Sequence, residues 1–297
     1  MTQKRLLLIV NPCSGRAKMY TELLKVVEIL SAADYAVTVY PTKYKGDATE
    51  YVSKLFENDY STIVVCGGDG TLNEVITGIM QAKLSTPLGY IPSGTLNEWS
   101  SGLKISRNIE TAAKDVTKSN KVMLDIGKFG DKFFSYTASF GAFTSASYSA
   151  PQNVKNVLGQ AAYFFEGIKS LGSIKPIHLK FTIDGITREG DYLFGAISNS
   201  LSVGGIVKYD KDSVVLNDGE FEVLLIKTPD NILKLQPLID GILKRDFQNE
   251  GFEFFKTKSI TVESSEPVSW TLDGEFAETN GALNIENIHN AITFLIP

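Results

Sequence analysis

The sequence predicts two domains, an N-terminal α/β domain with a parallel sheet and a larger β-rich domain with an antiparallel sheet. The length of 297 residues suits one large or two ordinary domains. Strand-like and helix-like segments alternate over the first 120 residues, as in a parallel sheet with crossover helices. From about Lys121 onwards most segments resemble strands, which is typical of an antiparallel sheet.

In the first domain, strands are indicated by short apolar runs and helices by apolar residues at helical spacing. Residues 5–10 (RLLLIV) form a continuous apolar run, as expected for a parallel strand covered on both faces. Residues 17–30 place apolar side chains at helical spacing. The further elements expected in order are a strand over 35–42, a helix over 48–58, a strand over 61–66, a helix over 71–82, a strand over 87–92 and a helix over 108–118.

The second domain is expected to contain mainly strands. The predicted strands are 121–130, 132–141, 177–185, 191–200, 220–228, 259–264 and 268–276. Two helices are predicted between them, over 154–171 and 231–245. The first has one broad apolar stripe, which usually packs on a sheet. The alternative is that part of it, with residues 140–153, walls a lipid channel or touches a membrane.

Composition limits the classes of partner. Hydrophobic residues make up 43% and charged residues 21%, so a sizeable core is expected and disorder is not. A net charge of −5 argues against nucleic acid as a partner. Cys13 and Cys66 are the only cysteines, too few for a disulfide scaffold. No segment approaches a signal peptide or a membrane span, and we expect a cytoplasmic protein with reduced thiols.

Small, glycine-rich segments follow three of the predicted parallel strands. They are residues 11–15 (NPCSG), 67–71 (GGDGT) and 92–95 (PSGT), and each is followed by a predicted helix. Ligands of open parallel sheets bind at this end of the strands. Glycine allows close approach of the main chain, and a helix N-terminus attracts anions. Asp69 beside a phosphate calls for a cation, so a magnesium–nucleotide complex fits both features.

The glycines do not form either of two common nucleotide-binding motifs. The sequence contains no G-x-x-x-x-G-K-[ST], and Asn73 stands where a dinucleotide fingerprint needs its third glycine. A Gly-Asp-Gly alone is equally typical of a tight turn. Three such segments at successive strand ends nevertheless favour a nucleotide site.

The segment VVCGGDGTLNEVITGI (64–79) strongly resembles the nucleotide-binding motif of the diacylglycerol kinase catalytic-domain family. That family includes bacterial soluble lipid kinases, sphingosine kinases and ceramide kinases, and is related more distantly to NAD kinases and phosphofructokinases. Residues 7–15, 91–103, 216–226 and 270–276 resemble further segments of the same family. The resemblance implies an NAD-kinase/phosphofructokinase-like α/β domain over 1–121, to which 288–297 return, and an antiparallel β-sandwich domain over 122–287.

The resemblance also implies roles for particular residues. Glu275 matches the general base, with Asp273 beside it, and Asp69 serves metal and phosphate placement. A structural magnesium would be held by the side chain of Asp218, by the main-chain carbonyls of Val215 and Glu220, and through water by Asp125. The residues expected to contact ATP are Asn11, Pro12, Cys13, Ser14, Gly15, Thr42, Gly67, Gly68, Asp69, Gly70, Thr71, Leu72, Asn73, Glu74 and Thr95.

The sequence departs from the family pattern at residues 94–101. The family commonly has G-T-G-N-D-F-A-R, whereas this chain reads GTLNEWSS, with Leu96 for glycine and Glu98 for aspartate. The departure affects the identity of the acceptor most. The function that the resemblance implies is an ATP-dependent lipid kinase that uses Mg²⁺ and phosphorylates diacylglycerol or a related lipid alcohol. An NAD kinase and a non-catalytic nucleotide-binding protein are the alternatives.

The same resemblance sets the expected partners. They are a lipid substrate, peripheral contact with the inner membrane surface and, as an open alternative to a monomer, a homodimer. The local pattern also fits ordinary turns: the pairs Asp184-Gly185, Asp218-Gly219 and Asp273-Gly274 are each typical of them.

Overall fold

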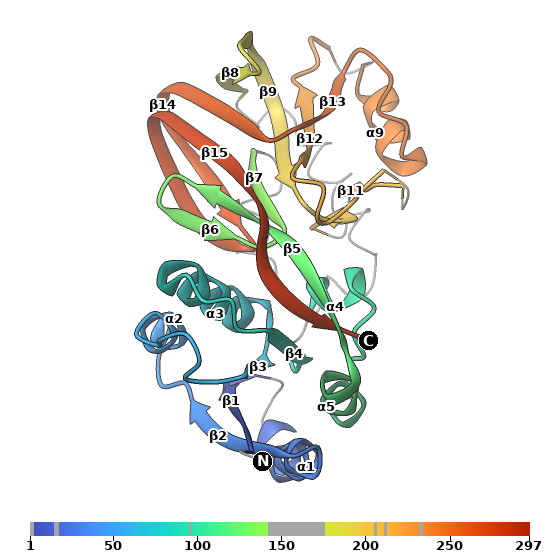
Figure 1. Cartoon of the computed structure of the whole chain (residues 1–297). Helices are drawn as coiled ribbons and strands as arrows, with labels where there is room; N and C mark the ends of the chain where they lie inside the picture. The colour runs from blue at the N-terminus through green and yellow to red at the C-terminus, as the bar shows by residue number, and fades with distance from the viewer. Residues whose placement is uncertain are drawn as a thin grey trace. The chain divides into compact units, whose positions relative to one another are not determined.

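The computed structural model describes residues 3–14, 18–94, 97–141, 176–204, 207–210, 213–231 and 234–297 (Figure 1). The chain forms two compact units. The first comprises Met1–Ile126 with Asn290–Pro297, and the second comprises Gly127–His289. The domain limits expected from the sequence stay a prediction. The predicted helix over 154–171 and its alternative as a lipid-facing wall lie outside the described residues.

A parallel sheet forms the centre of the first unit, as the sequence predicts. Its strands are β1 (Lys4–Val10), β2 (Tyr35–Pro41), β3 (Thr62–Gly67) and β4 (Leu88–Pro92). Their order is β4-β3-β1-β2, and every pair is parallel. Phe294, near the end of β15 (Glu275–Ile296), pairs with Leu88 and adds a further parallel strand. The carboxyl ends of all four strands therefore lie along one edge.

Helices cover both faces of this sheet. They are α1 (Lys18–Ala32), α2 (Asp47–Val52), α3 (Asp69–Ala82), α4 (Glu98–Gly102) and α5 (Ile109–Lys118). Helix α1 packs beside α5, and α2 packs beside α3, on the other side of the strands (Figure 1). The strand order with right-handed crossovers requires this division.

Helix α2 is shorter than the predicted helix over 48–58. It ends at Val52, and the chain then turns, with Asn58 at a φ of 71°. The carboxylate of Asp59 accepts a hydrogen bond of 2.8 Å from the amide of Phe56. This bond satisfies the amide of Phe56 outside a helix, as aspartate side chains commonly do in turns.

Antiparallel strands dominate the second unit. They are β6 (Lys132–Phe134), β7 (Thr137–Gly141), β8 (Ile177–Ile183), β9 (Ile186–Ser198), β10 (Ser202–Val203), β11 (Val207–Lys208), β12 (Phe221–Lys227), β13 (Phe252–Thr257), β14 (Ser259–Leu272) and β15, which begins here and ends in the first unit. Strand β5 (Asn120–Phe129) runs the other way, from the first unit into the second. The order along the main sheet is β13-β12-β9-β7-β14-β15. Strand β8 pairs with both β9 and β14, beyond the residues of those strands that pair with β7.

Two hydrophobic cores stabilise this unit, and β12 contributes to both. Phe221, Val223 and Leu225 pack in one core with Trp270. Leu224 and Ile226 pack in the other core, which includes residues of α9 (Leu235–Lys244). Alternate residues of a strand face opposite sides, so β12 is covered on both faces.

Three predicted strands of the second unit differ from the structure. The segment 132–141 is broken at Ser135 and Tyr136, between β6 and β7. The segments 259–264 and 268–276 instead form one strand, β14, with an irregularity between Ser264 and Val268. Pro267 lies in that irregularity, where the missing amide proton does not interrupt the ladder. The predicted fold class, a parallel α/β domain with a second antiparallel β-sandwich domain, is confirmed.

Candidate functional site

The loops at the carboxyl ends of β1, β3 and β4 meet at one place. We call this place the strand-end site and define it as Asn11–Ser14, Gly67–Thr71, Ser93, Gly94 and Asn97. Main-chain hydrogen bonds align the loops. The amide of Asn11 donates to the carbonyl of Cys66 at 2.9 Å, and the amide of Ser93 donates to the carbonyl of Gly67 at 2.8 Å. Three predicted glycine-rich segments are thus adjacent in space as well as similar in composition.

The main chains of Gly68 and Gly94 lie against each other. A β-carbon added to Gly94 would be 2.6 Å from the Cα of Gly68 and 2.7 Å from Oδ1 of Asn97. No side chain fits into such a space. The glycines therefore allow two loops to approach backbone to backbone, and they leave peptide groups rather than side chains at the surface of the site.

Asn97 shapes the loop after β4, and the sequence pattern did not indicate it as a site residue. It is buried and has a φ of 49°. Its Oδ1 accepts from the amide of Gly94 at 3.1 Å, and its Nδ2 donates to the carbonyl of Gly94 at 2.7 Å. Asparagine tolerates positive φ and bonds to nearby main chain, so its place three residues after Gly94 was the available signal.

Side chains connect the three loops. Nδ2 of Asn11 donates to the hydroxyl of Thr71 at 2.9 Å, and the hydroxyl of Ser93 donates to that of Ser14 at 3.0 Å. Pro12 is half-buried and Cys13 is exposed, with the amide of Cys13 donating to Oδ1 of Asn11 at 2.9 Å.

Cys66 lies under these loops and is shielded from solvent. It is fully buried at the end of β3. Burial raises the pKa of its thiol to about 12, against a hydrogen bond with Ser93. The thiolate is the reactive form, so Cys66 acts as a small packing residue.

Asp69 begins α3 instead of lying in a loop. The helix was predicted over 71–82, but α3 spans Asp69–Ala82, so of the expected ATP contacts Gly68–Glu74 only Gly68 precedes it. The reason is that the apolar face of this segment already begins at Leu72, whose amide donates to the carbonyl of Gly68 at 3.1 Å. Gly70 and Thr71 are accordingly in the first helical turn, where main-chain N–H groups have no partner within the helix.

The carboxylate of Asp69 is half-buried beside Tyr90. The hydroxyl of Tyr90 lies 3.4 Å from Oδ1 of Asp69 and 3.2 Å from Oδ1 of Asn97. Burial and the charge of Asp69 both raise the pKa of Tyr90 far above its ordinary value. Tyr90 thus stays a neutral donor that can orient the carboxylate.

Four other residues predicted to contact the nucleotide have contacts within the chain, and their part in nucleotide binding stays a prediction. Glu74 caps the start of α2: its Oε1 accepts from the amide of Gly46 at 2.8 Å. Asn73 lies one turn before Thr77, 3.5 Å from its hydroxyl, and Leu72 is buried. Thr42 follows β2, where its amide donates to the carbonyl of Val10 at 2.8 Å. Gly15 and Thr95 lie outside the described residues.

Asp273 and Glu275 belong to the hairpin between β14 and β15. Asp273 and Gly274 have φ angles of 49° and 90° and connect the paired residues Leu272 and Glu275. Positive φ at both positions is typical of a type I′ turn, so the predicted turn is confirmed. Glu275 is exposed at the first position of β15.

Asp273 has a role that the sequence did not reveal. Its carboxylate is buried and accepts hydrogen bonds from the amides of Ser135, Tyr136 and Thr137. It thereby fills the break between β6 and β7. These bonds indicate a positioning residue for the hairpin that carries Glu275.

The two carboxylates of the predicted structural magnesium site have partners within the chain. Oδ1 of Asp218 accepts from the amide of Glu220 at 3.0 Å, and its Oδ2 accepts from Nζ of Lys256 at 2.9 Å. Asp125 is buried in the first unit, and its Oδ1 accepts from the amide of Asn290 at 2.7 Å. Val215 is exposed. In the described part of the chain, no three acidic, histidine or cysteine side chains gather as a metal site would require.

Lys256 also lies 3.2 Å from Oε1 of Glu222, which is completely buried. Burial raises the pKa of Glu222 to about 7, against the interaction with Lys256. Burial lowers the pKa of Lys256, but the hydrogen bond with Asp218 and the ion pair with Glu222 outweigh it, and this pKa lies above its ordinary value. Lys256 therefore carries a positive charge beside both carboxylates.

Comparison with known proteins identifies both parts of the chain. Residues 5–129 match the diacylglycerol kinase catalytic domain, and residues 138–294 match the YegS C-terminal NAD kinase beta sandwich-like domain. A diacylglycerol kinase of Bacillus subtilis (strain 168) is 31% identical over 274 residues, which are 92% of this chain and 90% of that protein. The chain belongs to the diacylglycerol kinase family. A diacylglycerol kinase of Staphylococcus aureus (strain MRSA252) is 29% identical over 99% of this chain and 93% of its own.

Solved structures of the family have the same fold. The crystal structure of a diacylglycerol kinase from Bacillus anthracis str. Sterne matches with a TM-score of 0.77 and 26% identity, over 100% of this chain and 98% of its own. A further structure from that organism matches with a TM-score of 0.82 and 29% identity, over 100% and 96%. Family membership supports a kinase reaction. No helix in the described part of the chain combines the length and hydropathy that a bilayer crossing requires.

Proposed function

We propose that this protein transfers the γ-phosphate of ATP to a lipid hydroxyl, with diacylglycerol or a related lipid alcohol as the acceptor. The observation that carries the proposal is the strand-end site. It presents bare main chain at Gly68 and Gly94, the first turn of a helix, and one carboxylate, Asp69. A triphosphate with its magnesium ion needs all three features. The names of the family relatives support the choice of acceptor.

The nucleotide side of the reaction needs positioning and charge neutralisation more than covalent chemistry. We assign the phosphates to the amides around Gly67–Thr71, with Asn11 and Ser14 holding the loops in place. Asp69 would bind the magnesium ion that enters with ATP, or its waters. Tyr90, which is kept neutral by burial, would hold that carboxylate in one orientation.

The acceptor hydroxyl must lose its proton as phosphate arrives. We assign this proton to Glu275, an exposed carboxylate directly after a two-residue turn. A carboxylate near the acceptor suffices as a general base. Asp273 would act indirectly, by holding the turn through three main-chain amides.

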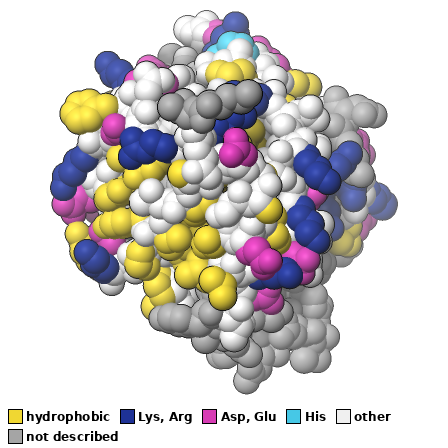
Figure 2. Space-filling model, turned by 60° about the horizontal axis from the view of Figure 1, so that its bottom comes forward, with side chains coloured by type: hydrophobic (Ala, Val, Ile, Leu, Met, Phe, Trp, Pro, Cys, Tyr) yellow, Lys and Arg dark blue, Asp and Glu magenta, His cyan; other side chains and the backbone are white. Residues whose placement is uncertain are grey.

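A lipid acceptor has to be taken from a bilayer or micelle. Figure 2 shows one face of the molecule, on which hydrophobic side chains reach the surface with lysine and arginine, and also aspartate and glutamate, side chains around them. Surface contact of this kind needs exposed apolar and basic groups and no spanning helix. We therefore propose peripheral contact with the membrane that holds the substrate.

The experiment is phosphate transfer from labelled ATP to a lipid panel in mixed micelles, with magnesium. The panel contains diacylglycerol, monoacylglycerol, ceramide and sphingosine, and a parallel arm contains NAD. We expect a labelled lipid product and no labelled NADP. Labelled NADP alone would make the protein an NAD kinase, and binding of ATP without transfer to any acceptor would leave it a nucleotide-binding protein.

Two variants test the assigned roles in the same assay. Asp69→Asn should abolish transfer, because the metal-bearing carboxylate is lost. Glu275→Gln should lower the turnover number by about 10²- to 10⁴-fold, the usual cost of a lost general base, with ATP affinity unchanged. Glu278→Gln, at another exposed glutamate of β15, is the matched control and should keep wild-type turnover. Wild-type turnover in Glu275→Gln would remove that residue from the mechanism.

A further inference from the structure

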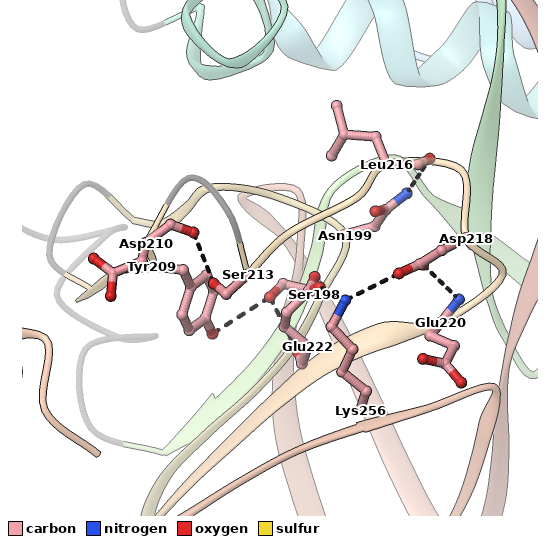
Figure 3. Close-up of polar contacts among 10 residues, drawn as sticks. All are labelled: Ser198, Asn199, Tyr209, Asp210, Ser213, Leu216, Asp218, Glu220, Glu222 and Lys256. Atoms are coloured by element: carbon pink, nitrogen blue, oxygen red, sulfur yellow. Dashed lines mark hydrogen bonds and ion pairs between the residues drawn. The ribbon is translucent and has the colours of Figure 1, made fainter. Parts of the chain in front are cut away.

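A cluster of two carboxylates and one ammonium joins β12 to the segment that precedes it. Glu222 on β12 pairs directly opposite Lys256 on β13 in the antiparallel register. Nζ of Lys256 lies 3.2 Å from Oε1 of Glu222 and 2.9 Å from Oδ2 of Asp218. Figure 3 shows Lys256 extending from its strand to Asp218. One cation thus binds two anions from different elements.

The position of Lys256 is dictated by Glu222. The side chain of Glu222 is 0% exposed, on the same face of β12 as Leu224 and Ile226 of the second core. A buried carboxylate without a counter-charge is very unfavourable. Lys256 is the cation that the structure pairs with it. Moving the ammonium away would leave the buried carboxylate of Glu222 without a counter-charge.

Asp218 is oriented by its own turn. Its Oδ1 accepts from the amide of Glu220 at 3.0 Å, and Gly219 adopts a φ of 79°. A β-carbon on Gly219 would be 3.2 Å from the ring of His289, so the turn packs closely on β15. The remaining oxygen, Oδ2, faces Lys256. The carbonyl of Leu216, two residues earlier, accepts from Nδ2 of Asn199 at 3.1 Å (Figure 3).

These contacts fit a structural magnesium poorly. Magnesium needs an octahedral set of oxygen ligands and gives up water reluctantly. Here both oxygens of Asp218 are occupied by donors, and an ammonium lies where a divalent cation would have to approach. Two cations on one carboxylate repel each other. The residues of this cluster therefore disagree with the metal set that family resemblance implies.

We propose that Lys256 takes the place of a structural divalent cation in this chain. Its ammonium neutralises Asp218 and Glu222 together and fixes the 213–220 segment to the β12–β13 pair. This part of the second unit then folds without metal, while the magnesium that accompanies a nucleotide is a separate requirement. The inference does not rest on the proposed function, because the cluster lies within one unit and its readouts are metal binding and melting.

The first test is metal binding to the nucleotide-free full chain. Manganese is the probe, titrated by electron paramagnetic resonance against wild type and Asp218→Asn. We expect the two titrations to coincide, and the melting temperature of wild type to be the same in EDTA and in magnesium. Stoichiometric manganese binding in wild type that Asp218→Asn abolishes would overturn the proposal. A magnesium-dependent rise in melting temperature that Asp218→Asn removes would do the same.

The second test is thermal unfolding in EDTA of Lys256→Met, Lys256→Arg and the control Lys227→Met. Lys227 on β12 is 3.0 Å from Glu253, but Glu253 keeps Arg188 as a second cation at 3.0 Å. Lys256→Met should lower the melting temperature by roughly 5–10 °C, and the other two by much less. Equal melting of Lys256→Met and Lys227→Met would contradict the proposal. If Lys256→Met does not fold, the manganese titration of wild type still decides.

Discussion

The strand-end site and the Asp218–Glu222–Lys256 cluster are built in opposite ways. The strand-end site removes side chains: Gly68 and Gly94 bring two loops into backbone contact. The cluster adds a side chain, because one ammonium neutralises two carboxylates. At the strand-end site the glycines leave main chain rather than side chains at the surface, which suits the ligand proposed for it, whereas Lys256 is paired with both carboxylates within the chain. The difference separates a site suited to binding from one suited to holding the fold.

The sharpest way to break the strand-end site is to add one methyl group. In Gly94→Ala the new carbon would be 2.6 Å from the Cα of Gly68, so the loops must move apart. We expect at least a ~10²-fold loss of phosphotransfer, as for an ångström-scale misplacement, with weaker ATP binding by calorimetry. Gly102→Ala, where no atom lies within 4 Å of the added carbon, is the control. Wild-type ATP affinity in Gly94→Ala would show that loop contact is unnecessary.

The cluster should respond in stability and not in binding. Lys256→Met leaves two carboxylates without their cation, one of them fully buried. We expect the free energy of unfolding in urea to fall by about 2–4 kcal/mol, near the lower end for a broken buried pair because Lys256 is partly exposed. ATP affinity should be unchanged. A loss of ATP affinity without a loss of stability would show that Lys256 contributes to nucleotide binding and not to the fold.

Asp273, in the hairpin that carries Glu275, tests whether a buried carboxylate can stabilise the fold with main-chain amides as its partners. Asp273→Ala removes the acceptor of three buried amides. Asp184→Ala removes an exposed aspartate from a turn of the same type, with φ angles of 50° and 78° at Asp184 and Gly185. The excess destabilisation of Asp273→Ala over Asp184→Ala should be about 2–3 kcal/mol by urea unfolding. Equal effects would reduce Asp273 to an ordinary turn residue.

The smallest effect concerns the two cysteines of the strand-end loops. Cys13 is exposed and Cys66 is buried, with a pKa raised to about 12 by burial. Iodoacetamide on the native protein at neutral pH should therefore modify Cys13 alone, as read by peptide mass spectrometry. Modification of Cys66 at a similar rate would mean that the loops above it open readily.

Local pattern predicted the elements whose signal lies within a few consecutive residues. The apolar run of residues 5–10 became β1, and the Asp273-Gly274 pair became the expected turn. Prediction failed where a distant residue intervened. The break between β6 and β7 depends on Asp273, which lies 138 residues from Ser135, and no local signal reports such a bond.

Site residues show the same division. Gly67, Gly68 and Asp69 were expected at the nucleotide site from glycine spacing and the strand before them. Asn97 and Tyr90 were not predicted, because their role depends on facing Gly94 and Asp69 in space. The predicted metal ligands rested on family resemblance. In the structure one of them, Asp218, accepts a hydrogen bond from Lys256 of β13.

The sequence by itself determined the succession of strands and helices, the turns and the glycine-rich strand ends, because these follow from hydrophobic periodicity and main-chain preferences within a few residues. Only the tertiary structure decided which side chains meet across the sheet. The pairing of strands sets those contacts. Lys256 lies opposite Glu222 because of the register of β12 and β13, and Asp273 contacts Ser135 because of the position of its hairpin. The energy of a buried charge depends on its neighbours in space, and the order of residues along the chain does not state them.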